Sequence, residues 1–329
     1  MKKILIATFA LAVMLGACKK EDVTKVMPKE VLASEKTQTT SNLSGARTVN
    51  TSFGSINFSK RWLVMSLETY TNAVEGASNT ELENLTKETT FVSMNKFLQA
   101  SQEESILKDT YNEVEVAHLL NAEGVIQIGE WIIRVDKANE KVFVLNQTQE
   151  SQYNDLLSGN TSNVNLKVYS TDDDVLSSLE EGSSSSERGI FCGARRANGK
   201  RTARTDYPYN NARKLQYKVE YLSVGIYFQL KSDVEFRNGS IIRTPASLGI
   251  EYNFKYEGRC NRGPSATANF SLAECGVKFC TQNNSGAYTI KHYRGSKALK
   301  KYFLGANFKL DYDSYKIYYT PTVTISDGY

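Results

Sequence analysis

The sequence predicts an α+β protein, in which N-terminal helices and a small antiparallel sheet precede a C-terminal antiparallel β-sandwich or barrel. Between about residues 59 and 120, apolar residues recur at helical spacing. From residue 125 onward they alternate with a period of two, as half-buried strands do. A Gly- and Ser-rich stretch and a reversal of net charge near residue 185 separate two modules.

The first 18 residues predict a lipoprotein export signal. Lys2 and Lys3 form a positive n-region, and the apolar run from Ile4 to Leu15 is too short to span a bilayer as a stable helix. Small residues precede Cys18, which we expect to become the acylated N-terminus after cleavage. Two or three acyl chains would hold the protein firmly, because each buried methylene contributes about 0.8 kcal/mol. An ordinary secretory signal or an N-terminal membrane anchor is the alternative.

Residues 19–55 predict a flexible tether, because they are rich in Ser, Thr, Lys and Glu and contain too few apolar residues for a core. The charged run Lys19–Asp22 directly follows Cys18. It resembles the surface-export tags of Bacteroidota lipoproteins. That resemblance implies a lipid-anchored location at the outer membrane, facing the cell exterior.

Charge divides the chain into two modules. Residues 19–187 contain 15 Lys and Arg against 26 Asp and Glu, whereas residues 188–329 contain 23 against 10. Together with the Ser-rich stretch, this predicts an acidic helical plus small-sheet module at 56–181, a linker at 182–190 and a basic all-β module at 191–329. Opposite charges favour contact between the modules, and an outside anionic surface is the alternative partner for the basic one.

Four cysteines remain once Cys18 carries lipid, and all lie in the C-terminal part. They are Cys192, Cys260, Cys275 and Cys280. In an exported chain they predict two disulfides with three possible connectivities, and buried free thiols are the alternative. The last two cysteines lack a matching second pair and the chain has only two histidines, so we predict no metal site and no cofactor.

Three helices are expected in the acidic module, because apolar residues lie on one face of each segment. They run from Ser59 to Glu75, from about Thr80 to Leu98, and from about Thr110 to Leu120. Strands are then expected on both sides of a tight turn at Gly129–Glu130, and at 142–145 and 166–169. Asp172–Asp174 predict the start of a short helix, since adjacent carboxylates suit a calcium loop poorly.

One segment of the acidic module carries a resemblance to a protein group. Asn121–Gly129 reads N-A-E-G-V-I-Q-I-G and is preceded by Leu63–Tyr70 and Phe91–Met94. These segments resemble the N-x-D/E-G-x-I-Q-I-G, "F-x-S-x-E" and "F-x-S" segments of uncharacterised Bacteroidota surface lipoproteins, although Met65 stands where an aromatic or aliphatic residue is usual. The resemblance covers roughly Arg61–Asn146. It implies a location and an architecture but no activity.

Strands fill the basic module, because apolar and aromatic residues alternate over most of it. The alternation changes phase at Leu222–Gly225, which predicts a bulge or sharp bend. Asn238–Gly239 predicts a hairpin turn. Seven or eight such strands indicate a sandwich or a closed barrel.

Fifteen of the nineteen tyrosines lie in the basic module. Exposed rows of tyrosine suit sugar or peptide binding, and the alternative is that tyrosine favours half-buried strands. Five cationic residues surround the turn at Asn198–Gly199: Arg195, Arg196, Lys200, Arg201 and Arg204. On an exported protein they predict contact with lipopolysaccharide, acidic glycans or the acidic module, not with nucleic acid. A merely solvated loop is the alternative.

The motifs of common enzyme classes do not occur in the sequence: it lacks G-x-S-x-G, H-E-x-x-H, a P-loop and a Rossmann fingerprint. We therefore predict a binding or interaction protein of the cell envelope, with a glycan, a peptide or an envelope protein as its partner. One alternative is a secreted glycosidase with two carboxylates, for which no local spacing rule exists. The other is a small outer-membrane β-barrel.

Overall fold

The computed structural model describes residues 47–58, 60–87, 91–101, 114–183, 201–209, 212–238, 242–243, 246–258, 265–275, 286–313 and 316–329. The export signal with Cys18, most of the predicted tether and most of the predicted linker lie outside these residues. Within them, helices combine with mainly antiparallel sheets, as predicted. No helix of the described residues is long and apolar enough to cross a membrane.

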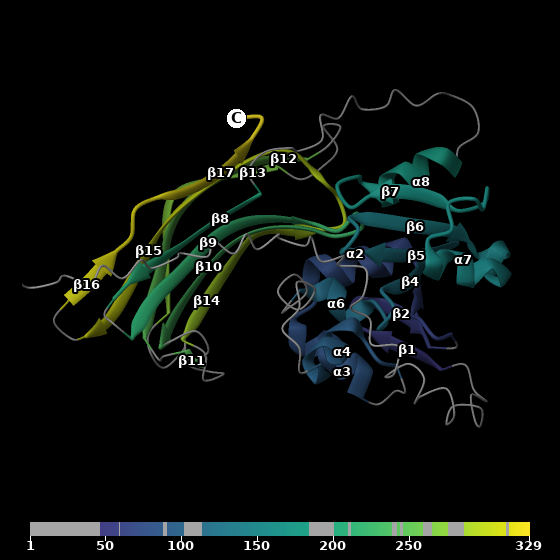
Figure 1. The fold of residues 1–329 in the computed structure, drawn as a ribbon, viewed down its shortest axis with the longest axis horizontal. Helices are drawn as coiled ribbons and strands as arrows, with labels where there is room; N and C mark the ends of the chain where they lie inside the picture. The colour runs from purple at the N-terminus through teal and green to yellow at the C-terminus, as the bar shows by residue number, and fades with distance from the viewer. Residues whose placement is uncertain are drawn as a thin grey trace, which may run out of the picture. The chain divides into compact units, whose positions relative to one another are not determined.

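A seven-stranded sheet organises the described part of the first module, and its strands follow the order of the chain (Figure 1). They are β1 (Thr48–Thr51), β2 (Gly54–Asn57), β3 (Val64–Met65), β4 (Val125–Ile128), β5 (Trp131–Asp136), β6 (Lys141–Asn146) and β7 (Lys167–Ser170). Neighbours are antiparallel except β3 and β4, where Val64 lies beside Gln127 in a parallel pair. The helices in the chain between these two strands provide the long crossover that parallel pairing needs.

The first two strands correct the predicted tether at 19–55, because β1 and the start of β2 lie inside that range. Thr48 to Thr51 pair with Gly54 to Asn57 in a hairpin. Of this hairpin and its turn, Phe53 and Ile56 are buried. A strand pair with so few buried residues has the polar composition of a tether, which is why the sequence did not reveal it.

The helices of the first module are shorter than predicted. They are α2 (Leu67–Gly76), α3 (Asn79–Lys87), α4 (Met94–Ala100), α6 (Glu115–Leu119), α7 (Tyr153–Ser158) and α8 (Val175–Ser183), with the 3-10 helix η2 (Gln147–Gln152). The helix predicted from Ser59 starts only after Ser66, whose hydroxyl accepts a hydrogen bond from the Thr69 N–H at 3.0 Å. The second predicted helix is split, because Ser93 caps a new helix by accepting from the Lys96 N–H.

Two further helix starts show how side chains satisfy free backbone groups. The capping box of α3 uses Ser78 and Glu81: the Ser78 N–H donates to Glu81 at 2.8 Å, and the Glu81 N–H donates to Ser78 Oγ at 3.2 Å. At α8, Asp174 Oδ1 accepts from the Ser177 N–H at 3.1 Å. The acidic run therefore begins a helix as predicted, with its last residue as the cap.

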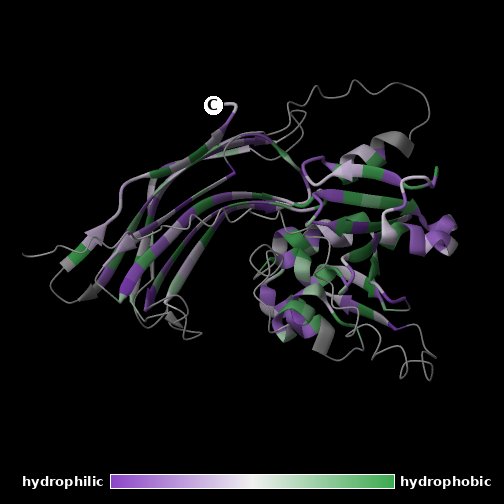
Figure 2. Ribbon diagram, in the orientation of Figure 1, coloured by the Kyte–Doolittle hydropathy of each residue, from purple (hydrophilic) through white to green (hydrophobic). Residues whose placement is uncertain are grey.

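The described part of the second module contains two five-stranded antiparallel sheets, neither of which closes on itself. One consists of β8 (Thr202–Pro208), β9 (Arg213–Ser223), β10 (Phe228–Asn238), β11 (Ile242–Arg243) and β14 (Ala287–Gly295). The other consists of β12 (Ser247–Gly258), β13 (Ser265–Cys275), β15 (Leu299–Asp313), β16 (Lys316–Tyr319) and β17 (Val323–Asp327). Hydrophobic and hydrophilic residues alternate along these strands, as the period-two pattern predicted (Figure 2).

The change of phase at Leu222–Gly225 is the turn of a hairpin between β9 and β10. The segment that we expected to bend or bulge is therefore two separate strands. The Val224 N–H donates to the Tyr227 carbonyl at 3.0 Å, and Gly225 has a φ of +81°. Val224, Ile226 and Tyr227 are buried in the same hydrophobic cluster as the helices of the first module. The tip of this hairpin therefore completes the first module's core.

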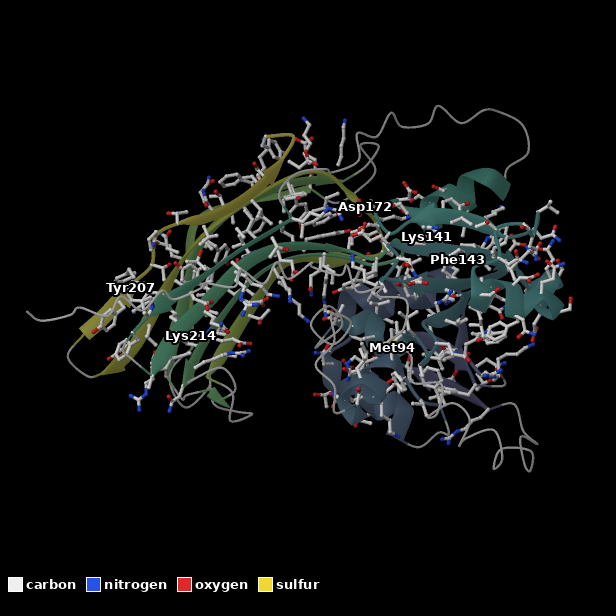
Figure 3. All side chains as sticks on the ribbon, viewed as in Figure 1. Met94, Lys141, Phe143, Asp172, Tyr207 and Lys214 are labelled. Atoms are coloured by element: carbon white, nitrogen blue, oxygen red, sulfur yellow. The ribbon has the colours of Figure 1, made fainter. Side chains whose placement is uncertain are left out.

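Ion pairs also join the modules, and in each the acid comes from the first module and the base from the second. In the described residues they are Asp172–Arg201, Glu115–Lys291, Glu115–Arg294 and Glu180–Lys297. Asp172 lies where the loop before α8 approaches the β module (Figure 3). The opposite net charges of the two modules thus have local counterparts where the modules meet, as the charge pattern predicted.

Candidate functional site

The exposed side of the sheet that contains β12 and β15 is the clearest candidate surface. Along these strands one set of alternating side chains is buried: Leu248, Ile250, Tyr302, Leu304, Ala306, Phe308 and Leu310. The other set must point away from the core, because successive strand side chains face opposite sides. We call this side the outer face; it consists of Glu251, Asn253, Lys255, Glu257, Lys301, Phe303, Gly305, Asn307, Lys309, Ile317, Tyr319, Thr324, Ser326 and Tyr329.

Strand register arranges the outer face in rows across the sheet. The rows are Lys255–Phe303–Ser326, Asn253–Gly305–Thr324, Glu251–Asn307 and Gly249–Lys309–Tyr319. Strand β15 supplies the middle member of each three-residue row, since it pairs with β12 on one side and with β16 and β17 on the other. The outer face is therefore a continuous surface of side chains around a central strand.

One end of the outer face carries exposed apolar side chains. Tyr319 is 63% exposed and Ile317 is 52% exposed. Tyr318, between them, turns inward and packs its ring 4.9 Å from that of Tyr209. Because Tyr318 anchors β16 to the core, the rings of Tyr318 and Tyr319 must point to opposite sides, and Tyr319 is presented to solvent.

The other end of the outer face holds Tyr329 against two lysines. The Nζ atoms of Lys255 and Lys301 lie 4.6 and 5.6 Å from the centre of its ring. Its hydroxyl donates to Glu257 at 2.8 Å. Burial and this hydrogen bond raise the pKa of Tyr329 to about 12, and the same bond lowers the pKa of Glu257. This end is a fixed basic and aromatic group.

The middle of the outer face is polar. Asn307 donates through Nδ2 to Glu251 at 3.4 Å, and its buried Oδ1 has no hydrogen-bond partner among the described residues. A Cβ atom at Gly305 would lie 2.6 Å from Asn253 Oδ1, so the Asn253 side chain occupies the space above the glycine. Amide groups therefore lie between an apolar end and a basic, aromatic end.

A pocket of about 430 Å³ in the first module is the second candidate. It opens between the end of α2, the start of α3 and the turn of the β1–β2 hairpin, and it is lined by Ser52, Phe53, Asn72, Glu75, Gly76, Ala77 and Glu81. Partial burial raises the pKa of Glu75, whereas hydrogen bonds from Ser78 lower that of Glu81. Two carboxylates whose pKa values move in opposite directions are the pairing that general acid and base catalysis uses.

A serine and a histidine also meet in the second module, but not as an accessible nucleophile. Ser232 Oγ lies 2.9 Å from His292 Nε2. The serine is fully buried, and the imidazole packs 4.6 Å from the ring of Tyr252 and 5.1 Å from that of Phe254. Burial lowers the pKa of His292 to about 4. The pair is a packed polar contact inside the β module.

Two of the five cations of the predicted polyanion site, Arg201 and Arg204, lie in the described residues. Arg195, Arg196 and Lys200 lie outside them. Arg201 forms an ion pair with Asp172 of the first module, so its charge stabilises a contact within the protein. Arg204 is 58% exposed in its side chain and lies 4.0 Å from Asp206. Arg201 thus contacts the acidic module, one of the three predicted partners, and Arg204 faces a carboxylate of its own strand.

Three of the four cysteines of the predicted disulfides, Cys192, Cys260 and Cys280, lie outside the described residues. Cys275 lies at the end of β13, where its backbone is paired with Leu248 of β12. The pairing of the cysteines therefore stays a prediction.

Most of the described tyrosines of the second module face the core, which fits the alternative that tyrosine favours half-buried strands. Buried examples are Tyr217, Tyr221, Tyr227, Tyr256, Tyr293 and Tyr302. Tyr207, Tyr319 and Tyr329 are the exposed ones in the described part of the second module. The sequence reveals the alternation of these side chains but not which phase faces solvent, so it could not separate the two groups.

No protein-family model matches the chain, and no curated protein matches it. In the described residues, no group of three or more His, Cys, Asp and Glu side chains is arranged to hold a metal ion.

Proposed function

We propose that this protein is a cell-envelope lipoprotein, anchored through Cys18 at the outer membrane and facing outward, which binds a partner through the outer face. The signal, the cysteine and the charged run that follows it support the location. The resemblance of Asn121–Gly129 to surface lipoproteins of the Bacteroidota supports the same location. The role is recognition, not catalysis.

The observation that carries the binding role is the exposure of Tyr319 and Ile317 side by side on β16. Neighbouring exposed apolar side chains on a strand often mark an interaction surface. Tyrosine adds a flat ring with a polar tip, which serves recognition well because few torsion angles must be fixed on binding. The regular rows of β15 hold this surface in place before any partner arrives.

We further propose that the two sheets of the second module pack face to face as a β-sandwich. Ring contacts from β9 to β15 support this: Tyr217 lies 4.9 Å from Phe308, and Tyr221 lies 4.6 Å from Tyr302. These side chains belong to one buried cluster with contributions from both sheets. In such a sandwich the inner faces make the core and the outer faces remain available for binding.

The binding role is tested with the mature chain carrying Cys18→Ser, so that no lipid is present. We compare three forms of this chain: one without further substitutions, the double variant Ile317→Ser/Tyr319→Ala, and the control Tyr207→Ala. Each is tested on a glycan array and in crosslinking pull-downs from outer-membrane extract. Tyr207 is an exposed tyrosine on β8, in the other sheet (Figure 3). We expect the double variant alone to lose its partner. Equal binding by all three chains would contradict a role for the outer face.

The pocket of Glu75 and Glu81 favours a second candidate, a hydrolase with two carboxylates. The opposite directions of their pKa shifts support an acid and a base in one pocket. The test is hydrolysis of chromogenic glycosides by the mature chain. Activity that is abolished by Glu75→Gln and by Glu81→Gln, but not by the control Glu68→Gln on the exposed side of α2, would support this candidate. If no glycoside in a broad panel is cleaved, the candidate is rejected.

A further inference from the structure

We infer that the partner of the outer face is a polysaccharide chain that lies along β15, from Tyr319 at one end to the Tyr329 group at the other. This inference rests on the proposed binding role and names the ligand class for it. Three features carry it: the pairing of β15 on both sides, the length and chemistry of the outer face, and the way its charges are compensated.

Strand pairing argues against a peptide that adds as a strand along β15, in the middle of the outer face. Peptides that bind by strand addition need a free edge with unpaired backbone groups. Over the outer face, β15 pairs with β12 on one side and with β16 and β17 on the other. A ligand that lies along β15 thus meets side chains instead of free backbone groups, and it must be recognised by stacking and by side-chain hydrogen bonds.

The length of the outer face fits a chain molecule. Tyr319 pairs with Lys309, and Tyr329 contacts Lys301, eight residues earlier on the same strand. At about 3.4 Å per residue these positions are roughly 27 Å apart. A ligand that reaches both ends must contain several sugar rings, whereas a single monosaccharide would touch only one of them.

The side chains along this path match the groups of a sugar chain. The exposed ring of Tyr319 can stack on the apolar face of a sugar ring. The amide of Asn253 and the exposed hydroxyl of Thr324 follow it, and they can exchange hydrogen bonds with sugar hydroxyls.

Charge compensation favours a ligand held mainly by uncharged contacts. Lys301 lies 3.9 Å from Glu257, and Lys255 lies over the Tyr329 ring. Glu251, in the row of Asn307, adds a further negative charge to the outer face. Binding should therefore depend little on salt, in contrast to polyanion binding, in which added salt screens the attraction.

The test is native affinity electrophoresis of the mature Cys18→Ser chain in gels containing mixed-linkage β-glucan, xylan, galactomannan or polygalacturonate, at low and high salt. We expect at least one neutral polysaccharide to retard the chain at both salt concentrations. Oligosaccharides of that polysaccharide should compete better as their length increases, up to the span of the outer face.

Two variants locate the site. Tyr319→Ala should weaken the retardation about tenfold, the effect of losing one aromatic stacking contact. Gly305→Ala should also weaken it, because the added Cβ displaces the Asn253 side chain, which lies at 2.6 Å from that position. Tyr207→Ala should bind as the wild type does. Matching circular dichroism spectra and melting temperatures show that all three variants fold.

Each alternative outcome overturns a defined part of the inference. Retardation by no neutral polysaccharide, or retardation that is lost at high salt, overturns the ligand class. If a protein crosslinks to the wild type but not to Tyr319→Ala, the ligand class is again wrong while the proposed binding role stands. Retardation that Tyr319→Ala and Gly305→Ala leave unchanged overturns the location.

Discussion

Replacement of Glu115 by Gln should destabilise the protein more than the loss of any exposed ion pair. The carboxylate is fully buried at the start of α6. It accepts a hydrogen bond from the Tyr227 hydroxyl at 2.6 Å and forms ion pairs with Lys291 and Arg294 of β14. Glutamine keeps the size of the side chain but removes the charge that these two cations face.

The magnitude follows from the exposure of the partners. Removing one member of a fully buried ion pair costs about 3–5 kcal/mol, because the other charge stays buried without compensation. The side chains of Lys291 and Arg294 remain 26% and 23% exposed, so water partly screens them. We therefore expect Glu115→Gln to lower the free energy of unfolding by about 2–3 kcal/mol.

Urea unfolding at pH 7 measures this difference, with Glu150→Gln as the matched control. Glu150 forms an ion pair with Lys60 at 2.5 Å, but the two side chains are 41% and 37% exposed. Loss of an exposed pair should cost less than about 1 kcal/mol. If Glu115→Gln destabilises no more than Glu150→Gln, the buried ion pairs do not stabilise the contact between the modules.

Acidic pH gives a second readout of the same group. Burial opposes ionisation of Glu115, but the charge of Lys291 and hydrogen bonds from Lys291 and Tyr227 outweigh it and lower the pKa of Glu115 from the usual 4.5. A lowered folded-state pKa contributes stability above pH 4.5, and this contribution is lost as pH falls through the folded-state value. The stability difference between wild type and Glu115→Gln should therefore be largest near neutral pH and should shrink below pH 4.5.

Three more substitutions test other parts of the structure. Gly225→Ala should lower the unfolding free energy by about 1–3 kcal/mol in urea titrations, because the φ angle of Gly225 is +81° and an added Cβ would lie 2.5 Å from Val142 Cγ2. Unchanged stability would contradict this turn geometry. Asp174→Ala should lower the unfolding free energy by about 2 kcal/mol in the same assay, because Asp174 caps α8 and also accepts a hydrogen bond from the buried Ala298 N–H at 3.0 Å. An unfolding free energy equal to that of the wild type would rule out both hydrogen bonds. Cys18→Ser should move the protein from the detergent phase to the aqueous phase in Triton X-114 partitioning of cells, and continued detergent partitioning would argue against lipid attachment at this residue.

Much of the strand content could be predicted from the sequence, because one side of each strand is buried. The alternation over 248–256 and 302–310 reflects strands β12 and β15, whose inner side chains are almost fully buried. The turn at Gly129–Glu130 was also predicted correctly: β4 and β5 pair on either side of it, and Gly129 has a φ of +57°. Local pattern is sufficient where burial repeats with the period of the strand.

Features that depend on distant residues could not be predicted in this way. Leu63 fits the apolar face of the predicted helix with Leu67, but it directly precedes β3, which pairs in parallel with β4 some sixty residues later in the chain. The hairpin of β1 and β2 is similar, since it adds to the edge of a sheet formed by later residues. Tertiary pairing outweighs local helical preference at such positions.

The candidate site shows the same limit. The sequence indicated that tyrosines of the second module could bind sugars or peptides, yet it could not identify Tyr319 as exposed and Tyr302 as buried. That distinction depends on which side of the β12–β15 sheet carries the core. The cationic segment at 195–204 was more conspicuous in the sequence, but Arg201 is engaged by Asp172, to which no local motif connects it.

The most direct test of the proposed function is titration calorimetry with the polysaccharide that retards the mature Cys18→Ser chain most. It compares this chain, which serves as the wild type, with its Tyr319→Ala and Tyr207→Ala variants. The dissociation constant should rise about tenfold for Tyr319→Ala and stay within error of the wild type for Tyr207→Ala. Equal dissociation constants for the three chains would show that the outer face is not the binding surface.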